Sequence, residues 1–165
     1  MKRTQADIGR LIAELGVDRS QMEDLAELNA RAAERIRAGS VDLLDYSALG
    51  YTIHNIYGLI ENACFRIVKF FENGLSPDAW HKELLDRMPL AIPGIRPAFF
   101  TREEYLVMDE LRGFRHVFRN LYSRPLDMAR LDALQEKVPL AVKMFEDSVA
   151  RYSKILERLG ESIED

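Results

Sequence analysis

Cysteine and long apolar runs are scarce in this chain of 165 residues. Its single cysteine, Cys64, cannot form a disulfide within the chain, which favours a reducing compartment. No stretch reaches about 18 uninterrupted apolar residues, and the opening residues MKRTQADIGR hold no apolar segment typical of a signal peptide. The sequence therefore predicts a cytoplasmic protein that makes no contact with a membrane.

The motifs of common enzyme classes are also missing. The three histidines and the cysteine do not fall at metal-ligand spacing, so we expect no metal site and no bound cofactor. Neither a glycine-rich phosphate loop nor a G-x-S-x-G nucleophile turn occurs. The net charge of −4 argues against a general coat for nucleic acid, because such binding depends on neutralising many phosphates. Any contact with nucleic acid must be local.

Helical periodicity dominates the chain, and alternation of the β type is absent over any useful length. A hydrophobic content of 47% is enough for a continuous core. We expect an all-α, up-and-down bundle of five or six helices. Residues 1–40 are predicted to form an N-terminal hairpin of two short helices that meet near Gly16, and residues 41–160 to form the bundle itself.

Glycines and prolines indicate where the later helices begin and end. The next helix is predicted to be the longest, capped by Ser40, apolar nearly all round and central to the bundle. Three prolines in residues 89–97 predict a loop. The last helix, over residues 127–159, should kink or divide at Pro139.

One stretch, LRGFRHVFRNLY at residues 111–122, has the composition of a site. It belongs to a helix that should begin at a capping box of Thr101 and Glu104. On that helix the apolar side chains fall on one face and the arginines on another. Residues 111–126 hold no acid, although the chain has 27 acidic and 23 basic residues. The four arginines of this stretch are Arg112, Arg115, Arg119 and Arg124.

Clustered arginines repel one another unless an anion neutralises them, which favours a patch that binds phosphate or an acidic partner. The alternative is a solvated surface on which Arg112 pairs with Asp109 or with acids elsewhere, for about 0–1 kcal/mol a pair. His116 lies one turn before Asn120 and adds a group that titrates near physiological pH. Metal-free RNA cleavage needs proton transfers and a stabilised charge on phosphorus, which suit histidine and arginine.

Two polar residues of the central helix, His54 and Glu61, are seven positions apart and hence share one face. They can orient a reacting group or pair with an arginine of the basic helix. Alternatively they satisfy each other, or a backbone group, in a polar layer of the core. Gly58 between them should admit a neighbouring side chain. Tyr51 and Tyr57 are interpreted as core aromatics.

The segment RHVFRNLY resembles the Arg-polar-x-x-x-His-x-Tyr signature of HEPN-type ribonucleases, especially the HepT toxins of prokaryotic toxin–antitoxin pairs. Arg115 matches the arginine, His116 the polar position and Tyr122 the tyrosine, whereas Asn120 stands where the family has its catalytic histidine. The stretches ALGYTIHNIYGLIENACFRIVKFF, WHKELLDRM and IPGIRPAFFT are also similar to segments of HepT-like proteins. The resemblance covers roughly residues 41–160.

This resemblance implies a helical bundle that forms a homodimer, with the two motifs facing each other across a cleft. It also implies metal-independent RNA cleavage, and a nucleotidyltransferase antitoxin that blocks the toxin by adenylylating Tyr122. With His54 and Glu61 in support, the candidate site comprises Arg115, His116 and Asn120 for catalysis and Arg112, Arg119 and Arg124 for phosphate binding.

The asparagine at position 120 predicts attenuated cleavage. An amide holds a phosphate by hydrogen bonds but exchanges no proton near neutral pH, so Asn120 removes a contribution of about 10²–10⁴-fold. His116 is the nearest substitute. Two other interpretations stay open: a non-catalytic module that binds a nucleotidyltransferase or a nucleotide, and a structural dimer whose arginines form salt bridges between subunits.

Overall fold

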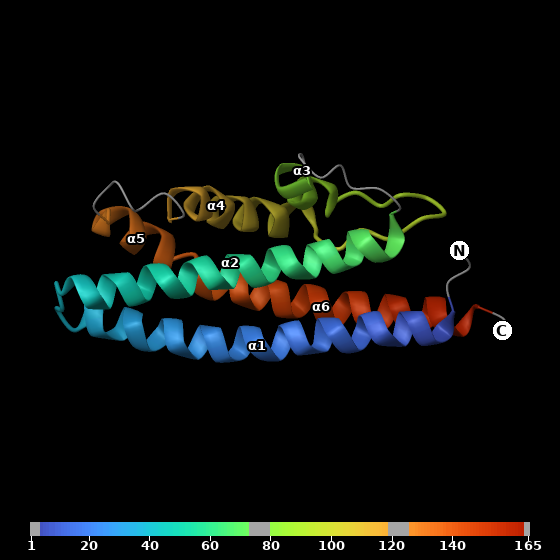
Figure 1. Ribbon diagram of the computed structural model, residues 1–165, viewed down its shortest axis with the longest axis horizontal. Coiled ribbons are helices and arrows are strands. Elements are labelled where there is room, and N and C mark those ends of the chain that lie inside the picture. Colours follow the sequence, from blue (N-terminus) through green and yellow to red (C-terminus); the bar gives the residue numbers. More distant parts are fainter. Residues whose placement is uncertain (1–3, 73–79, 119–125, 164–165) are drawn as a thin grey trace.

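The computed structural model describes residues 4–72, 80–118 and 126–163, without the side chains of residues 80–82 and 116–117. These residues form six helices (Figure 1): α1 (Gln5–Arg37), α2 (Leu43–Phe71), α3 (Trp80–Arg87), α4 (Arg102–Phe118), α5 (Met128–Gln135) and α6 (Val138–Glu161). Within the described ranges the only β pairing is an isolated bridge between Ile92 and Arg96. The predicted all-α bundle is confirmed.

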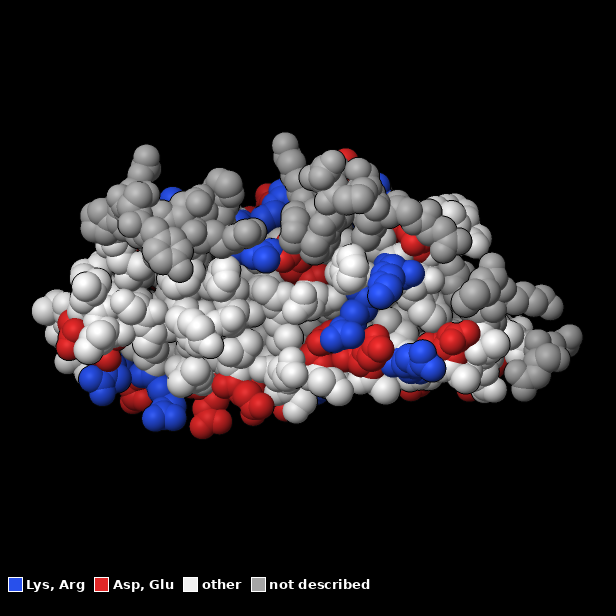
Figure 2. Space-filling view, in the orientation of Figure 1, with Lys and Arg blue, Asp and Glu red and all other residues white. Residues whose placement is uncertain are grey.

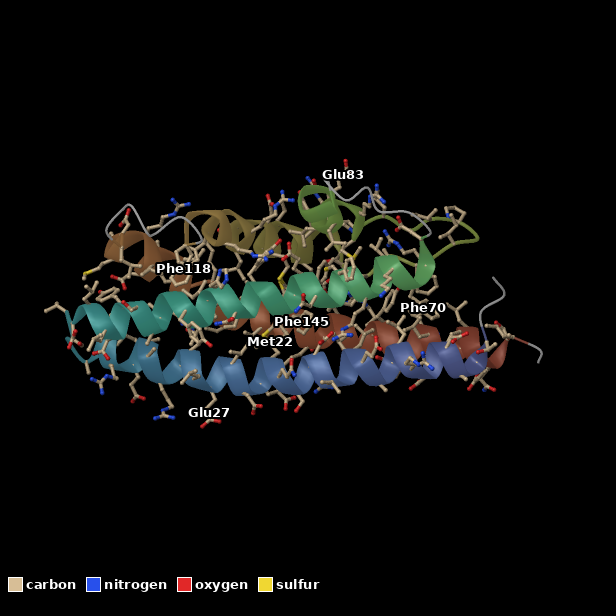
Figure 3. All side chains as sticks on the ribbon, viewed as in Figure 1. Met22, Glu27, Phe70, Glu83, Phe118 and Phe145 are labelled. Carbon is tan, nitrogen blue, oxygen red and sulfur yellow. The ribbon has the colours of Figure 1, made fainter. Side chains whose placement is uncertain are left out.

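The helices form two layers. α1, α2 and α6 run side by side along the molecule, and the shorter α3, α4 and α5 lie over α2 on the side away from α1 (Figure 1). Met22 and Phe145 fill the space between the long helices, whereas Glu27 and Glu83 point away from the bundle (Figure 3). α2 contacts every other helix, which confirms its predicted central place. None of the helices described is both long and apolar enough to cross a membrane.

α1 corrects the prediction for the first forty residues. Instead of a hairpin that turns near Gly16, one continuous helix of 33 residues forms, and it is longer than α2 with 29. Leu11, Leu15 and Met22 lie on one buried stripe that passes Gly16 without a break. A glycine inside a helix costs only about 0.5–1 kcal/mol, so the packing of this stripe outweighs it.

The capping and proline signals have mixed outcomes. Asp42 caps α2, not Ser40 as predicted, and its carboxylate accepts the N–H of the second helical residue. The capping box at the start of α4 is confirmed, with the Thr101 N–H donating to Glu104 at 2.6 Å and the Glu104 N–H donating to Thr101 at 3.2 Å. The predicted break in the last helix is confirmed as the boundary between α5 and α6, with Pro139 in the first turn of α6.

The connector between α3 and α4 folds around one buried arginine. The side chain of Arg96 is 0% exposed, and its Nε donates to the carboxylate of Glu72 at 2.7 Å. Its two terminal nitrogens donate to the backbone carbonyls of Arg87, Leu90 and Pro97. The predicted loop is confirmed, and a single guanidinium organises it.

Candidate functional site

α4 carries two of the four predicted arginines, Arg112 and Arg115, and packs against α2 and α6. Met108 and Leu111 belong to its fully buried stripe. Arg115 follows Leu111 by four residues, so it lies one turn further along the same side of the helix. The side chain of Arg115 is accordingly only 22% exposed and faces α2.

Arg115 forms an ion pair with Glu61 of α2, between Nη1 and Oε2. The Glu61 side chain is 7% exposed, and the guanidinium carbon of Arg115 lies 5.8 Å from the ring centroid of Tyr57, one turn earlier on α2. Among the alternatives for Glu61, the structure selects the pairing with an arginine of the basic helix. Burial raises the pKa of the Tyr57 hydroxyl well above its ordinary value, so Tyr57 stays neutral beside this pair.

Arg112 pairs with two carboxylates of its own chain. Its terminal nitrogens lie 3.0 Å from Asp86 of α3 and 2.5 Å from Asp109 of α4. The hydroxyl of Tyr105 donates to the same Asp86 oxygen at 2.8 Å. The predicted pairing of Arg112 with Asp109 is confirmed. The sequence analysis missed Asp86, because it lies on another helix and no local spacing connects it to Arg112.

These ion pairs correct the expected electrostatics of the patch. An external anion is not needed to relieve the charge of Arg112 and Arg115, because three carboxylates of the same chain face these two arginines. The described side chains also include no group of three His, Cys, Asp or Glu placed to hold a metal ion. The chemical group that this part of the site offers is the guanidinium of Arg115, which its pair with Glu61 fixes and which stays partly exposed.

Several predicted residues lie outside the described part of the chain. His116 belongs to α4, but its side chain is not among those described. The other residues outside the description are Arg119, Asn120, Tyr122 and Arg124. The structure therefore pairs Arg115 with Glu61 and pairs Arg112, one turn earlier on α4, with Asp86 and Asp109. The rest of the constellation stays as predicted from the sequence.

His54 faces the end of α4. Its ring stacks on Phe118, with the centroids 5.1 Å apart and an angle of 29° between the planes. His54 and Glu61 thus contact α4 at two places, at its last residue and at Arg115. The expected role of Gly58 is wrong for the described residues, since none of their atoms lies within 4 Å of a Cβ built there. Gly50, one turn before His54, makes such room instead.

The first turns of α2 present an uncharged surface. Leu44 is 75% exposed and Tyr51, seven residues later on the same side, is 56% exposed. Ser47 and Ala48 between them are also exposed. Figure 2 shows this part of α2 as an uncharged area, whereas charged side chains gather along α1. The prediction that Tyr51 is a core aromatic is therefore wrong, and that for the buried Tyr57 is confirmed.

A sequence model of one family, described as HepT-like protein, matches residues 48–156. The match covers more than half of the chain, from the first turns of α2 to the last turns of α6. The chain belongs to the HepT-like family. The predicted family is thereby confirmed, and both Glu61 and Arg115 lie inside the matched region. Comparison with curated proteins and with solved structures gives no significant match.

Proposed function

We propose that this HepT-like protein is the toxin of a toxin–antitoxin pair. It binds RNA on the surface where α2 and α4 meet around Arg115 and Glu61, the α2–α4 face, and cleaves the RNA slowly without metal. The ion pair between Arg115 and the buried Glu61 carries this proposal. Buried ion pairs are weak sources of stability, because well-packed apolar residues of similar volume often stabilise a fold equally well. A pair of this kind within the family motif is better explained as a means of orienting a guanidinium.

Each residue of the site has a distinct proposed role. The Arg115 guanidinium stabilises the charge that develops on phosphorus, after the phosphate has displaced part of its contact with Glu61. Arg119 and Arg124 contact neighbouring phosphates. His116 exchanges the proton, whereas Asn120 only donates and accepts hydrogen bonds, so cleavage is slow.

The charge balance of the described site favours a second candidate. Arg112 and Arg115 together face Glu61, Asp86 and Asp109, which leaves this part of the surface without the excess positive charge that attracts RNA. A non-catalytic module that binds a nucleotidyltransferase fits this balance and the amide at position 120. In both candidates, Tyr122 is the residue that the nucleotidyltransferase modifies.

We further propose that two copies associate through the uncharged surface of α2, which comprises Leu44, Ser47, Ala48 and Tyr51. Two such surfaces meet across a two-fold axis without repulsion between like charges. The purely structural dimer, in which arginines bridge the subunits, loses support because Arg112 and Arg115 pair within their own chain. A Tyr51→Asp variant should shift the protein from dimer to monomer in analytical ultracentrifugation.

RNA cleavage in the presence of a chelator tests the proposed activity. We expect slow cleavage by the natural protein and its loss in both Arg115→Ala and His116→Ala. Arg31→Ala on the outer face of α1 is the control and should cleave as the natural protein does, because Arg31 is exposed and far from α4. Salt-sensitive binding of a nucleotidyltransferase or a nucleotide, without any RNA cleavage product, would support the second candidate. Unchanged cleavage in both site variants would refute the assignment.

A further inference from the structure

One glycine of α2 lies beneath α4, whose last turn holds the first half of the family motif, and beneath α5, the helix that follows the motif. A Cβ built at Gly50 would lie 2.8 Å from Cε2 of Phe118 and 3.6 Å from Cδ2 of Leu131. Phe118 is the last residue of α4, and Leu131 is the buried residue of α5. In the sequence, the residues between these two helices contain the rest of the motif. The first half of the motif and the helix that follows it therefore pack on the same point of α2.

This contact requires the absence of a side chain. Real Cβ atoms essentially never approach another atom within 3.0 Å, so a methyl group at Gly50 would force a neighbour to move. The Phe118 ring is also bounded by His54, at 5.1 Å between centroids, and by Phe114, at 5.7 Å. Because aromatic rings occupy these two sides, Phe118 can turn away from a larger residue only toward its partly exposed side, which would move it off its seat on α2.

α5 has its own attachment to the bundle. Asn29 of α1 and Gln135 of α5 exchange two hydrogen bonds between their side-chain amides, at 2.9 and 2.7 Å. The hydroxyl of Tyr46 on α2 donates to Asp132 of α5 at 3.1 Å. These bonds fix α5 independently of Gly50, so the displacement caused by a larger residue would fall on Phe118 and the end of α4.

We propose that Gly50 is a positioning residue for the α2–α4 site. Its missing side chain lets Phe118 seat against α2, and this contact fixes the last turn of α4, which includes Arg115. The other glycines on described helices lack this role: no described atom lies within 4 Å of a Cβ at Gly16 or Gly113, and contacts at Gly160 are of ordinary length. The effect of Gly50 on the packing of α4 follows from geometry alone. Its effect on RNA cleavage rests on the proposed function.

The test compares Gly50→Ala with Gly16→Ala, a control in the middle of α1 where a methyl group meets open space. Alanine favours a helix, so Gly16→Ala should raise the melting temperature. Gly50→Ala should show no such rise. It should also speed amide hydrogen exchange over residues 114–118 by about tenfold, the size expected for over-packing. RNA cleavage should fall by roughly 10–100-fold, because misplacement of about 1 Å is costly in a catalytic site.

A second substitution keeps the test decisive if Gly50→Ala folds poorly. Leucine lacks the outer ring atoms that a Cβ at position 50 would meet, so Phe118→Leu in the Gly50→Ala background should restore slow exchange. Phe118→Leu alone should speed exchange at the end of α4, because the seat on α2 is left unfilled. Gly50→Ala that matches Gly16→Ala in melting and exchange would overturn the inference. Absence of cleavage in the natural protein would refute only the proposed function. The rate of amide hydrogen exchange would still test whether Gly50 positions Phe118.

Discussion

Glu61 of α2 pairs with Arg115, and Glu72, which follows the last residue of α2, pairs with Arg96 and Arg87. The guanidinium groups of Arg96 and Arg115 differ in what surrounds them. Arg96 is fully buried and donates to Glu72 and to three backbone carbonyls, so the protein itself surrounds it. Arg115 stays 22% exposed on the α2–α4 face. The comparison teaches that an arginine–glutamate pair does not mark a site by itself. Access of solvent, and hence of a ligand, separates the candidate functional pair from the structural one.

The largest expected effect concerns the enclosed pair. Arg96→Met removes a guanidinium that organises the connector between α3 and α4, and it leaves several carbonyls without their donor. We expect the free energy of unfolding to fall by about 3–5 kcal/mol, measured by urea denaturation. The exposed Arg31→Met on α1 is the control and should change it by less than about 0.5 kcal/mol. A loss below about 1 kcal/mol for Arg96→Met would remove the distinction between the two pairs.

A smaller loss of stability should follow at the partly exposed pair of Arg115 and Glu61, together with a loss of function. Arg115→Met leaves the buried carboxylate of Glu61 without its guanidinium and should cost about 1–3 kcal/mol. Adding Glu61→Leu should restore most of that stability, since an apolar pair packs as well as an ionic one. RNA binding should stay lost in the double variant. Binding that returns together with stability would show that the Arg115–Glu61 pair is as structural as the Arg96–Glu72 pair.

A third arginine–glutamate pair extends the comparison to pH and should give the smallest effect. Burial by itself raises the pKa of Glu104, but hydrogen bonds from Arg151, at 2.8 and 3.0 Å, and from the Thr101 N–H outweigh it and hold the pKa below its ordinary 4.5. A carboxylate whose pKa is lower in the folded than in the unfolded state stabilises the fold at every pH above its unfolded-state pKa. This stabilisation is lost as the pH falls through the folded-state pKa.

We therefore expect the natural protein to lose stability as the pH falls below about 4.5, and protonation of Glu104 contributes to that loss. Glu104→Gln keeps the capping geometry but removes the titration, so its urea midpoint should fall less between pH 5 and pH 3. An identical acid-side decline in the two proteins would show that this pair contributes no pH-dependent stability.

Local signals predicted much of the fold. The capping box at Thr101 and the break at Pro139 depend on neighbours in the chain, and both are confirmed. Gly16 was misleading because its small local cost is outweighed by the packing of a long stripe, which no local signal measures. The family assignment rested on the order of motif, central helix and connector, and the family match confirms that assignment.

The site was harder to predict because its partners come from other helices. Arg115 lies four residues after Leu111, a spacing that places it beside the buried stripe as well as beside the other arginines. The position of Glu61 on α2 decides which way the Arg115 side chain faces. Neither Asp86 nor the seat of Phe118 on Gly50 has a signature in a single sequence, because each contact joins helices far apart in the chain.

Cleavage of RNA in the presence of a chelator by Asn120→His, with and without Arg115→Ala, tests most directly the claim that Arg115 is the central group of the site. An imidazole at position 120 restores the missing proton exchange, so we predict that Asn120→His raises the cleavage rate about 10²–10⁴-fold and that Arg115→Ala abolishes this gain. A gain that persists without Arg115, or an Asn120→His protein that still binds RNA but cleaves no faster, would contradict the account.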